Sequence, residues 1–385
     1  LRLYMAPMDS ASLSTAASST QGSWRNMTRN EKCSLDDGQL SDIADLVQEH
    51  LEKFDGKSNL CQLRDGAGSI LELEPADLEV GRLIGSGSFN DVYEATVAEH
   101  ACGNIGGKKR AYVLKHLTSD VMNDVDKHTT GMVDLVLEAR ILTGLDHVNI
   151  CRIEGVPAGK ITDVIQSGIV GSYFLLLERV ECTLHEKVHF DWSRTQDTKL
   201  KKRALSMLSK ESTSFPKIRF HVAEQIARGL DYLHSKNIIY RDVKPANIGM
   251  DFEGRAKIFD FGLAKEVTNP KRKNTGLCGT RRYMAPEVGR CRMYGLSCDV
   301  YSISILFWEM LALERPFAKL AAKDFGETVY FGTERPVIPK KWPEEIKTLL
   351  PQCWKVDQDT RPSMKEFADA MAEFAKAAPE DDEDD

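Results

Sequence analysis

The stretch IIYRDVKPANIGM, Ile238 to Met250, joins apolar residues typical of a buried strand to a short polar loop. The loop holds a carboxylate at Asp242, an ammonium at Lys244 and an amide at Asn247, and a proline stiffens the turn. A carboxylate near a hydroxyl can orient it and accept its proton, and a lysine can neutralise charge on a transferring phosphoryl group. The amide oxygen suits magnesium, a hard cation. We interpret the loop as a site for phosphoryl transfer, with a charged surface turn as the alternative.

A second stretch, AKIFDFGLAK, supports the first interpretation. Its alternating apolar residues predict a strand that leads into Asp260, which Phe261 and Gly262 follow. An aspartate after a strand, followed by a flexible glycine, is well placed to hold a metal ion. Because this motif follows the polar loop, the surface-turn alternative loses weight.

The stretch LIGSGSFNDVY, residues 83–93, places Gly85 and Gly87 on either side of Ser86 in a strand–turn–strand pattern. Glycine permits tight backbone geometry and the close approach of a ligand. A Rossmann glycine motif would open a helix, so dinucleotide binding is disfavoured. Taken alone, the stretch is equally consistent with an ordinary hairpin.

Lys115 closes the predicted strand AYVLK, where Val113 shares its face. Glu138 lies in MVDLVLEARILTGL, whose apolar stripe predicts an amphipathic helix. The glutamate can reach back to a strand lysine, or it is one more solvated side chain. An exposed edge lysine is the alternative for Lys115, so neither residue decides the function alone.

The elements that position these residues change from strands to helices along the chain. Strands are predicted in LEVGRLIG, DVYEATVA, AYVLKHL and SYFLLLERV, and later helices in FHVAEQIARGLDYLHS, SCDVYSISILFWEMLAL and MKEFADAMAEFAK. Strands first and helices later predict an α+β protein in two parts. The dense pattern spans residues 78–375, and the polar, basic residues 190–216 are interpreted as an insertion loop.

The flanking segments have simpler compositions. Residues 1–40 are rich in Ser, Thr and Ala, and we expect disorder because they bury too little apolar surface. Residues 41–77 contain SDIADLVQEHLEKF, whose apolar spacing predicts a short helix with Ser41 as its N-cap. A surface helix is favoured there, with packing on the main domain or partner binding as alternatives. Residues 376–385 form a predicted acidic tail.

Composition disfavours several classes of protein. The chain has 385 residues, of which 42% are hydrophobic and 28% charged, close to globular averages. Its net charge of -7 argues against a nucleic-acid partner. No apolar run reaches the roughly 18 residues of a membrane helix, and the start LRLYMAPMDS lacks a signal-peptide core. Nine cysteines without Cys-x-x-Cys spacing suggest neither zinc nor disulfides, so a reducing, cytoplasmic setting is expected.

Together, the motifs resemble the signature of the eukaryotic protein kinase family. Six motifs of that signature occur in the family's order within residues 78–375: the glycine-rich loop, the strand lysine, the helix glutamate, the catalytic loop, Asp-Phe-Gly and Ala-Pro-Glu. The resemblance implies a bilobal fold, with an antiparallel sheet plus one helix in an N-lobe, residues 78–178, and a mainly helical C-lobe, residues 179–375. ERPVIPKKWP and CWKVDQDTRPSM look most like the tyrosine-kinase-like branch of the serine/threonine kinases.

The resemblance assigns roles around the phosphates of ATP. Gly85, Ser86 and Gly87 would cover the phosphates. Lys115 would bind the α- and β-phosphates, and Glu138 would pair with Lys115 in the active state.

The same likeness assigns the transfer step to the later motifs. Asp242 would accept or orient the substrate hydroxyl, and Lys244 would stabilise the transferring phosphoryl group. Asn247 and Asp260 would hold two Mg²⁺ ions. ATP and magnesium are thus the implied cofactors.

An adenine pocket is implied by further residues. Ile84 and Val92 would sandwich the ring, and Val113 stands where the family usually has alanine facing it. LLLERVECTL resembles the connector between the lobes, with Leu177 as gatekeeper and Glu178 to Val180 offering backbone hydrogen bonds to adenine.

Other likenesses concern structure and substrate. By resemblance, Glu287 in YMAPE would pair with Arg361 in DTRPSM, and Asp299 would brace the catalytic loop. The Lys-Pro-Ala-Asn run favours the hydroxyls of Ser and Thr in protein substrates. Thr280 would bond to the catalytic aspartate and lysine.

Some residues depart from the family's pattern. Tyr240 replaces the catalytic-loop histidine, and an aromatic ring can fill the same packing role. Asn90 replaces the third glycine, which puts loop flexibility in doubt but not phosphate contact. The loop of residues 98–110 is long. None of these departures removes a catalytic group.

Regulation by phosphorylation is a further hypothesis. Arg241 precedes the catalytic aspartate, so a phosphate on the activation loop would have a cationic partner. Thr275 is the favoured acceptor and Thr268 the second candidate, modified by an activating kinase or by autophosphorylation. The alternative is a basic loop that recruits acidic substrates.

An active serine/threonine protein kinase is therefore the leading hypothesis. A pseudokinase scaffold is the rival, but it would usually lack one of Lys115, Asp242 or Asp260, and all three are present. A small-molecule phosphotransferase is disfavoured because such enzymes usually lack the YMAPE and TRPSM pair. A tyrosine kinase is a minor alternative.

Overall fold

The computed structural model describes residues 31–58, 60, 70–98, 111–194, 215–267 and 274–379. They form two compact bodies. The N-terminal body holds the described residues up to 146 together with 151–179, and the C-terminal body holds 147–150 and those from 180 onward. Residues 1–30, most of the predicted insertion and residues 380–385 of the predicted tail lie outside the described residues.

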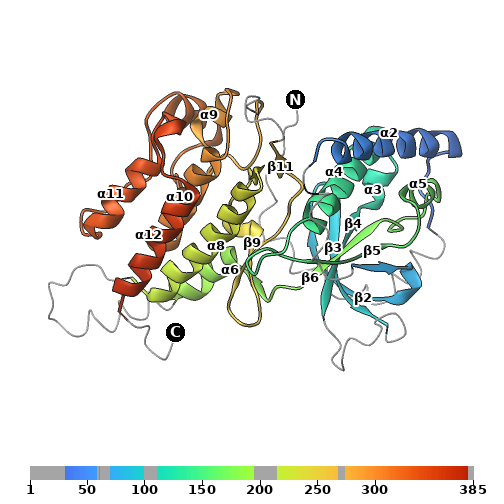
Figure 1. The fold of residues 1–385 in the computed structure, drawn as a ribbon, viewed down its shortest axis with the longest axis horizontal. Helices are drawn as coiled ribbons and strands as arrows, with labels where there is room; N and C mark the ends of the chain where they lie inside the picture. The colour runs from blue at the N-terminus through green and yellow to red at the C-terminus, as the bar shows by residue number, and fades with distance from the viewer. Residues whose placement is uncertain are drawn as a thin grey trace. The chain divides into compact units, whose positions relative to one another are not determined.

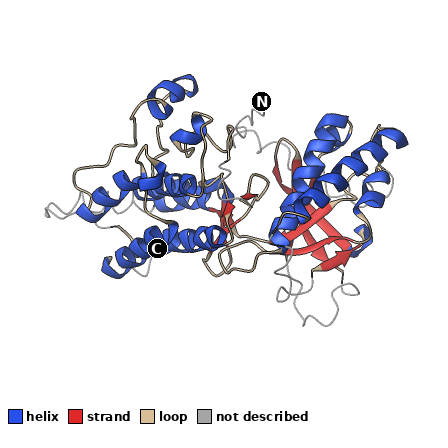
Figure 2. Ribbon diagram, turned by 45° about the horizontal axis from the view of Figure 1, so that its top comes forward, coloured by secondary structure: helices blue, strands red, loops and turns tan. Residues whose placement is uncertain are grey.

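A six-stranded sheet forms the base of the N-terminal body (Figure 2). Its strands follow the spatial order β1-β5-β6-β4-β3-β2. Their bounds are β1, Leu71–Leu73; β2, Leu78–Ser86; β3, Asn90–Val97; β4, Tyr112–Leu117; β5, Ile153–Pro157; and β6, Phe174–Glu178. The predicted antiparallel pairing is present from β2 to β6, and β1 extends the sheet by pairing in parallel with β5.

Alternation along β4 decides which face of the sheet each side chain reaches. Tyr112 and Leu114 belong to a buried apolar cluster that also contains Leu78 and Leu176 from neighbouring strands. Since successive side chains of a strand point to opposite faces, Lys115 lies on the other face. The strand thus places a lysine beside the core without burying its charge in the apolar cluster.

Several helices accompany this sheet, where the resemblance implied one. They are α2, Asp37–Asp55; the 3-10 turn η3, Pro75–Asp77; α3, Ser119–Met122; α4, Val125–Thr143; and α5, Ile161–Gln166. α4 is the helix predicted around Glu138, and it packs against β4 and β5. α2 packs against α4 and α5 (Figure 1). The additional helices arise from the chain ahead of the sheet and from connections between its strands.

α2 begins earlier than predicted because of its cap. The Asp36 carboxylate accepts a hydrogen bond from the Gln39 N–H at 2.9 Å, and the Gln39 side chain accepts one from the Asp36 N–H at 3.0 Å. This capping box satisfies N–H groups that the first turn of a helix leaves without partners. Ser41 lies inside the helix, so the prediction that it forms the N-cap was wrong.

The residues ahead of α2 pair with the loop that follows α5. Lys32 forms an antiparallel bridge with Ile169, and the Cys33 N–H donates to the Gly168 carbonyl at 2.9 Å. The Cys33 side chain is buried. The prediction of disorder was therefore wrong for residues 31–40, because backbone pairing and the capped helix stabilise them.

The C-terminal body is mainly helical, as predicted. Its helices and helical turns are α6, Leu184–Glu186; η4, Lys187–Trp192; α8, Lys217–Ser235; η5, Pro245–Asn247; α9, Pro286–Gly289; α10, Ser297–Ala312; η6, Ala322–Asp324; η7, Gly326–Tyr330; α11, Glu344–Cys353; η8, Gln358–Thr360; and α12, Met364–Ala377. α8 and α12 pack side by side, and α10 is buried along most of its length (Figure 1). A strand-built body and a helical body confirm the α+β class.

Short strands position the two polar motifs of the C-terminal body. One sheet joins β7, Cys182–Thr183, to β9, Ile248–Met250, and β10, Ala256–Ile258, and another joins β8, Ile238–Ile239, to β11, Lys265–Glu266. The polar loop runs from the end of β8 to the start of β9, and Asp260 follows β10. Along the stretches that the structure describes, no helix is both long and apolar enough to cross a membrane.

Candidate active site

In the N-terminal body, Lys115 of β4 and Glu138 of α4 form a buried ion pair. The Lys115 Nζ atom lies 2.8 Å from Glu138 Oε2 and 3.1 Å from Oε1. The lysine side chain is 11% exposed and the glutamate side chain 2%. Removing one partner of such a pair leaves an uncompensated buried charge. The pair that the resemblance implied is therefore present, and it depends on how α4 sits against β4.

The glycine-rich stretch is a tight hairpin between β2 and β3. Gly85 pairs with Val92, and the Gly87 N–H donates to the Asn90 carbonyl at 2.8 Å. A Cβ atom added at Gly87 would lie 3.5 Å from its nearest neighbour, and one at Gly85 would lie 3.7 Å away. These are ordinary contacts, so packing within the protein does not require glycine at either position. Open backbone here suits the close approach of a ligand.

The predicted adenine-contacting residues of the N-terminal body lie on β2, β3, β4 and β6. Ile84 of β2 is 44% exposed, so its side chain is accessible to a ligand. Val92 pairs with Lys115 across β3 and β4, and Val113 pairs with Leu177 across β4 and β6. Val113 and Lys115 therefore share the sheet face that Leu177 also joins.

Backbone groups of the connector residues already make contacts within the protein. The Glu178 N–H donates to the Arg152 carbonyl at 2.9 Å, so this donor is already used inside the protein. The Glu178 carbonyl accepts a weak thiol hydrogen bond from Cys151 at 3.4 Å. Val180 belongs to the C-terminal body, where its side chain packs closely on Gly249. For Glu178, the carbonyl rather than the amide suits a ligand contact.

In the C-terminal body, three predicted residues converge on the carboxylate of a fourth, Asp242. Asp242 Oδ1 accepts a hydrogen bond from the Thr280 hydroxyl at 2.7 Å. Asp242 Oδ2 accepts from Lys244 Nζ at 2.7 Å and from Asn247 Nδ2 at 3.0 Å. Lys244 Nζ also reaches the Thr280 hydroxyl at 3.2 Å. A carboxylate that accepts hydrogen bonds from this many donors is held in one orientation.

A side chain of α10, Asp299, fixes the backbone of the polar loop. The fully buried Asp299 accepts hydrogen bonds from the Tyr240 N–H at 2.8 Å and the Arg241 N–H at 2.9 Å. His234 Nε2 lies 3.0 Å from the same carboxylate. Arg241 has a φ of 70°, a left-handed conformation that a non-glycine residue keeps only when its surroundings impose it. The Asp299 contacts supply that restraint, as the resemblance implied.

Gly279 allows the following segment to approach the loop. It has a φ of 99°, and an added Cβ atom would lie 2.4 Å from the Arg241 carbonyl oxygen. No L side chain fits such a contact, so glycine is required. The close approach brings Thr280, the next residue, within hydrogen-bond distance of Asp242.

Tyr240 links the polar loop to the Asp260 motif. Its hydroxyl donates to the Phe259 carbonyl at 2.5 Å, and its ring packs edge-on against Phe261 at 5.3 Å between centroids. Asp260, between those two residues, has a φ of 63°. The buried tyrosine therefore fills the packing role of the absent histidine and also restrains the backbone that presents Asp260.

The residues present fit a magnesium ion bound with its nucleotide. Asn247 uses its Nδ2 atom on Asp242, which leaves the amide oxygen as the ligating atom. No group of three or more His, Cys, Asp or Glu side chains poised for a metal occurs among the described residues. An amide oxygen with a single carboxylate is a donor set that Mg²⁺ completes with phosphate oxygens and water.

Two cations lie close together beside the polar loop. The Arg241 side chain donates to the Leu263 carbonyl at 2.6 Å and to the Tyr294 hydroxyl at 3.3 Å. Burial lowers the pKa of Lys265, and the neighbouring Arg241 cation lowers it further. An anion bound here would relieve this repulsion. Of the two predicted phosphorylation sites, Thr275 is exposed, and Thr268 lies outside the described residues.

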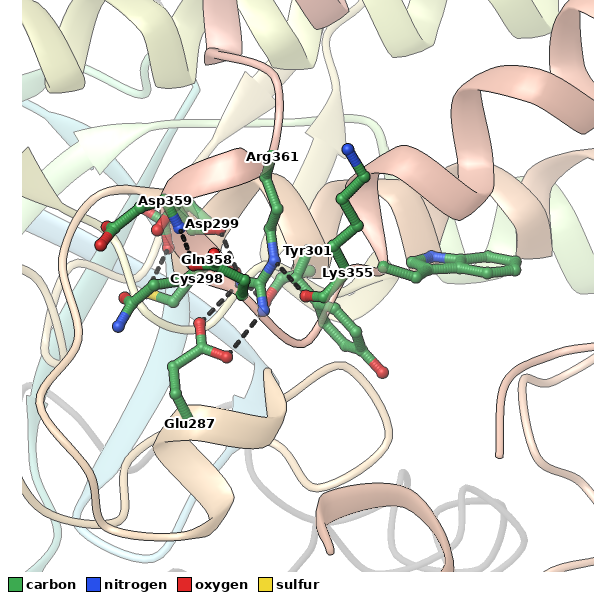
Figure 3. A network of polar contacts seen from close by, with 12 residues as sticks. Glu287, Cys298, Asp299, Tyr301, Lys355, Gln358, Asp359 and Arg361 are labelled. Atoms are coloured by element: carbon green, nitrogen blue, oxygen red, sulfur yellow. Dashed lines mark hydrogen bonds and ion pairs between the residues drawn. The ribbon is translucent and has the colours of Figure 1, made fainter. Parts of the chain in front are cut away.

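The predicted pair of Glu287 and Arg361 is also present (Figure 3). The two guanidinium nitrogens of Arg361 each donate to a different carboxylate oxygen of Glu287, both at 2.7 Å. Arg361 Nε donates to the Lys355 carbonyl at 3.0 Å, and the guanidinium lies 5.3 Å from the centre of the Tyr301 ring. This buried bidentate ion pair joins α9 to the chain just after η8.

A third polar cluster was missed at the sequence level. The fully buried Glu309 of α10 accepts a hydrogen bond from the Tyr283 hydroxyl at 2.6 Å and lies 2.8 Å from His189 Nε2. Burial, and then the Glu309 carboxylate, raise the pKa of Tyr283 well above its usual range. Ser302 donates to the Tyr283 carbonyl at 2.8 Å. One signal was available, since Glu309 is a lone carboxylate in the apolar run ISILFWEML.

Comparison with known proteins agrees with these features. The family model described as Protein kinase domain matches residues 78–371. The dual specificity protein kinase shkC of Dictyostelium discoideum is 28% identical over 310 residues, covering 78% of this chain and 52% of the relative. The serine/threonine-protein kinase STY17 of Arabidopsis thaliana is 35% identical over 161 residues, 42% of this chain and 28% of the relative.

A third relative aligns over more of this chain. The serine/threonine-protein kinase CTR1 of Arabidopsis thaliana is 26% identical over 313 residues, 81% of this chain and 33% of the relative. The chain spans about half or less of the length of the curated relatives it matches.

Proposed function

Because the chain belongs to the protein kinase domain family, we propose that it transfers the γ-phosphate of ATP to Ser and Thr hydroxyls of protein substrates. The observation that carries this function is the convergence of Lys244, Asn247 and Thr280 on the Asp242 carboxylate. Phosphoryl transfer needs mainly positioning and charge compensation, and this arrangement supports both.

Asp242 orients the attacking hydroxyl in this proposal. Its two oxygens already accept hydrogen bonds from Lys244 and Thr280, so the carboxylate is fixed before a substrate arrives. A substrate hydroxyl can donate to it and pass on its proton as the bond to the γ-phosphorus forms, while the bond from that phosphorus to the β-phosphate oxygen breaks and ADP leaves. Lys244 Nζ lies 2.7 Å from the same carboxylate and neutralises charge on the transferring group.

Lys115 binds the α- and β-phosphates, and Glu138 fixes the direction of the lysine side chain. Their 2.8 Å contact supports this role, because it fixes the position of the lysine ammonium in the N-terminal body. Gly85, Ser86 and Gly87 cover the phosphates. Packing within the protein does not require glycine at either position, which supports a role in close backbone approach to a ligand.

Asn247 and Asp260 hold magnesium, which supplies charge neutralisation at the β- and γ-phosphates when it is bound. The adenine ring is proposed to lie between Ile84 and Val92, with Val113 facing it and Leu177 as gatekeeper. The exposure of Ile84 supports an apolar ligand contact. Glu178 and Val180 provide the backbone contacts.

Serine and threonine specificity rests on the Lys-Pro-Ala-Asn run and on Thr280. Similar proteins carry serine/threonine-protein kinase or dual specificity protein kinase in their names. We place the protein in the cytoplasm, with no nucleic-acid partner, on the basis of its cysteine spacing and its net charge of -7.

Regulation through Thr275 is part of the proposal. A phosphate on this exposed threonine would offer both Arg241 and Lys265 an anionic partner. The phosphate could be added by an activating kinase or by autophosphorylation. We expect Thr275→Ala to lower both the activity and the phosphate stoichiometry of purified protein. Full activity with unchanged stoichiometry would show that Thr275 has no such role.

The experiment that tests the function follows radiolabelled γ-phosphate from Mg-ATP to a mixed protein substrate. Wild-type protein should label it, Asp242→Asn protein should not, and phosphoamino-acid analysis should return phosphoserine and phosphothreonine. ATP binding without transfer in both proteins would instead favour the pseudokinase alternative. Phosphotyrosine alone would contradict the assigned specificity.

A further inference from the structure

Helix α2 lies outside the matched family domain, which begins at residue 78, yet it packs on the helix that carries Glu138. In Figure 1, α2 lies beside α4 in the N-terminal body. One face of α2 is apolar and buried, and its members are Leu40, Ile43, Ala44, Val47 and Leu51. This spacing puts them on a single helical face. α2 is thus an integral part of the N-terminal body.

The chain around α2 contacts both ends of α4. Ahead of α2, the Ser34 N–H donates to the Asn123 side chain at 2.7 Å, just before α4 begins. After α2, Leu60 packs on the end of α4 so closely that a Cβ atom at Gly144 would lie 3.0 Å from its Cβ atom. These contacts restrict sliding of α4 along its own axis.

An ion pair joins α2 to α4 near the glutamate itself. Asp55 Oδ2 lies 3.2 Å from an Arg140 guanidinium nitrogen, and Arg140 is two residues beyond Glu138. Both side chains are about a third exposed, so the pair contributes little to the free energy of unfolding. It does favour one rotation of α4 about its axis.

The sequence of α4 explains why the helix needs outside support. Its first half contains Thr129, Thr130 and Gly131 in succession, all poor helix formers in a helix interior. An added Cβ atom at Gly131 would lie 2.8 Å from a methyl group of the buried Leu117, so that side chain would have to shift. A helix of low intrinsic propensity depends on tertiary packing for its stability.

We propose that α2, with its flanking residues 31–36, 56–58 and 60, is a positioning element that holds α4 where Glu138 pairs with Lys115. The inference rests on the proposed kinase function, in which this pair orients the phosphate-binding lysine. A chain that begins at the edge of the matched domain would keep every catalytic residue and lose this support.

A matched pair of substitutions in the full chain tests the proposal. Ile43→Asp places a carboxylate on the buried face of α2, where the native side chain is 0% exposed, whereas Leu46→Asp makes a similar change at a side chain 44% exposed. We expect kcat/KM for ATP to fall about tenfold in Ile43→Asp and less than about twofold in Leu46→Asp. Hydrogen exchange should quicken in residues 125–143 of Ile43→Asp and stay unchanged in α10.

A double-mutant cycle separates positioning from general loss of stability. Glu138→Gln removes the charge through which α2 is proposed to act. In that background Ile43→Asp should lower kcat/KM by less than about twofold, because interacting sites are not additive. A full tenfold loss in both backgrounds would overturn the proposal. If Ile43→Asp fails to fold, Ile43→Ala takes its place in the same double-mutant cycle. Its expected loss of kcat/KM is smaller, and an equal loss in both backgrounds would again overturn the proposal.

The outcomes also distinguish this inference from the proposed function. If wild-type protein shows no Mg²⁺-dependent transfer that Asp242→Asn abolishes, the proposed function fails and the inference fails with it. If transfer is present and Ile43→Asp matches Leu46→Asp in activity and in exchange of α4, only the positioning role of α2 is wrong.

Discussion

The Lys115–Glu138 pair and the network around Asp242 are supported in very different ways. The pair joins one strand to one helix through two contacts of 2.8 and 3.1 Å. Asp242 accepts hydrogen bonds from three side chains, and buried Asp299 fixes the backbone just before it. A small shift of α4 would break the pair completely, whereas the carboxylate would keep most of its partners after the loss of one. The N-terminal set is therefore adjustable and the C-terminal set rigid.

Asp242→Asn should have the largest effect, and it should fall on kcat. Asparagine keeps the shape of the side chain but cannot accept a proton, so we expect kcat to drop about 10³-fold. KM for ATP should stay within about twofold, because this residue contacts the substrate hydroxyl in our proposal. Steady-state kinetics of both proteins check this, with Asp191→Asn on the surface as the control. A rise in KM with unchanged kcat would assign Asp242 to nucleotide binding instead.

Arg361→Ala probes the rigidity of the C-terminal body. The substitution leaves the buried Glu287 carboxylate without its bidentate partner, which typically costs about 3–5 kcal/mol in the free energy of unfolding. Lys365→Ala removes an exposed partner of Asp369 and should leave the free energy of unfolding nearly unchanged, because exposed ion pairs contribute little. Urea unfolding of the two variants gives the comparison. Equal losses in the free energy of unfolding would mean that the Glu287–Arg361 ion pair, seen in Figure 3, does not stabilise this body.

His128 makes the N-terminal body sensitive to acid. The ring is 1% exposed on α4, and burial lowers its pKa from 6.5 to about 4. The unfolded chain binds this proton more tightly, so the stability contributed by the neutral ring is present above pH 6.5 and is lost as pH falls toward 4. The loss between pH 7 and pH 5 should be about 2 kcal/mol.

Unfolding in urea at several pH values measures this effect. His128→Leu protein should show a shallower decline between pH 7 and pH 5 than wild-type protein. Parallel declines would mean that His128 takes up its proton without disturbing α4.

Glu138→Gln should have the smallest effect of these changes. Glutamine can still accept a hydrogen bond from Lys115, and a charged partner contributes roughly 1.5 kcal/mol more than a neutral one, so kcat/KM should fall about tenfold. The loss should appear in KM for ATP as well as in kcat, unlike that of Asp242→Asn. A loss confined to kcat would mean that the Lys115–Glu138 pair and the Asp242 network do not differ in function as proposed.

Short motifs made the rigid set predictable from sequence. Asp242, Lys244 and Asn247 lie within six residues, so their spacing alone indicates a shared site. Lys115 and Glu138 are 23 residues apart, and their pairing was one of two alternatives until the resemblance to a family favoured it. The strand and helix patterns gave the α+β class because period-2 and period-3.6 spacing are local properties.

Features that depend on distant contacts were beyond sequence reasoning. The apolar face of α2 was visible, but its partner was not, because an amphipathic stripe does not specify what covers it. Disorder was predicted up to residue 40, since composition does not show that Cys33 pairs with a loop far along the chain. The contact between Glu309 and His189 joins residues 120 positions apart and left only a lone carboxylate as a trace.

The most direct test of the proposed phosphotransfer measures labelled γ-phosphate on a serine- and threonine-containing protein, with the full chain and ATP, in the presence and absence of Mg²⁺. We expect transfer only with the metal present. Magnesium-dependent ATP binding without any transfer would contradict the role given to the Asp242 network, and the absence of magnesium-dependent binding would contradict the roles given to both sets of residues.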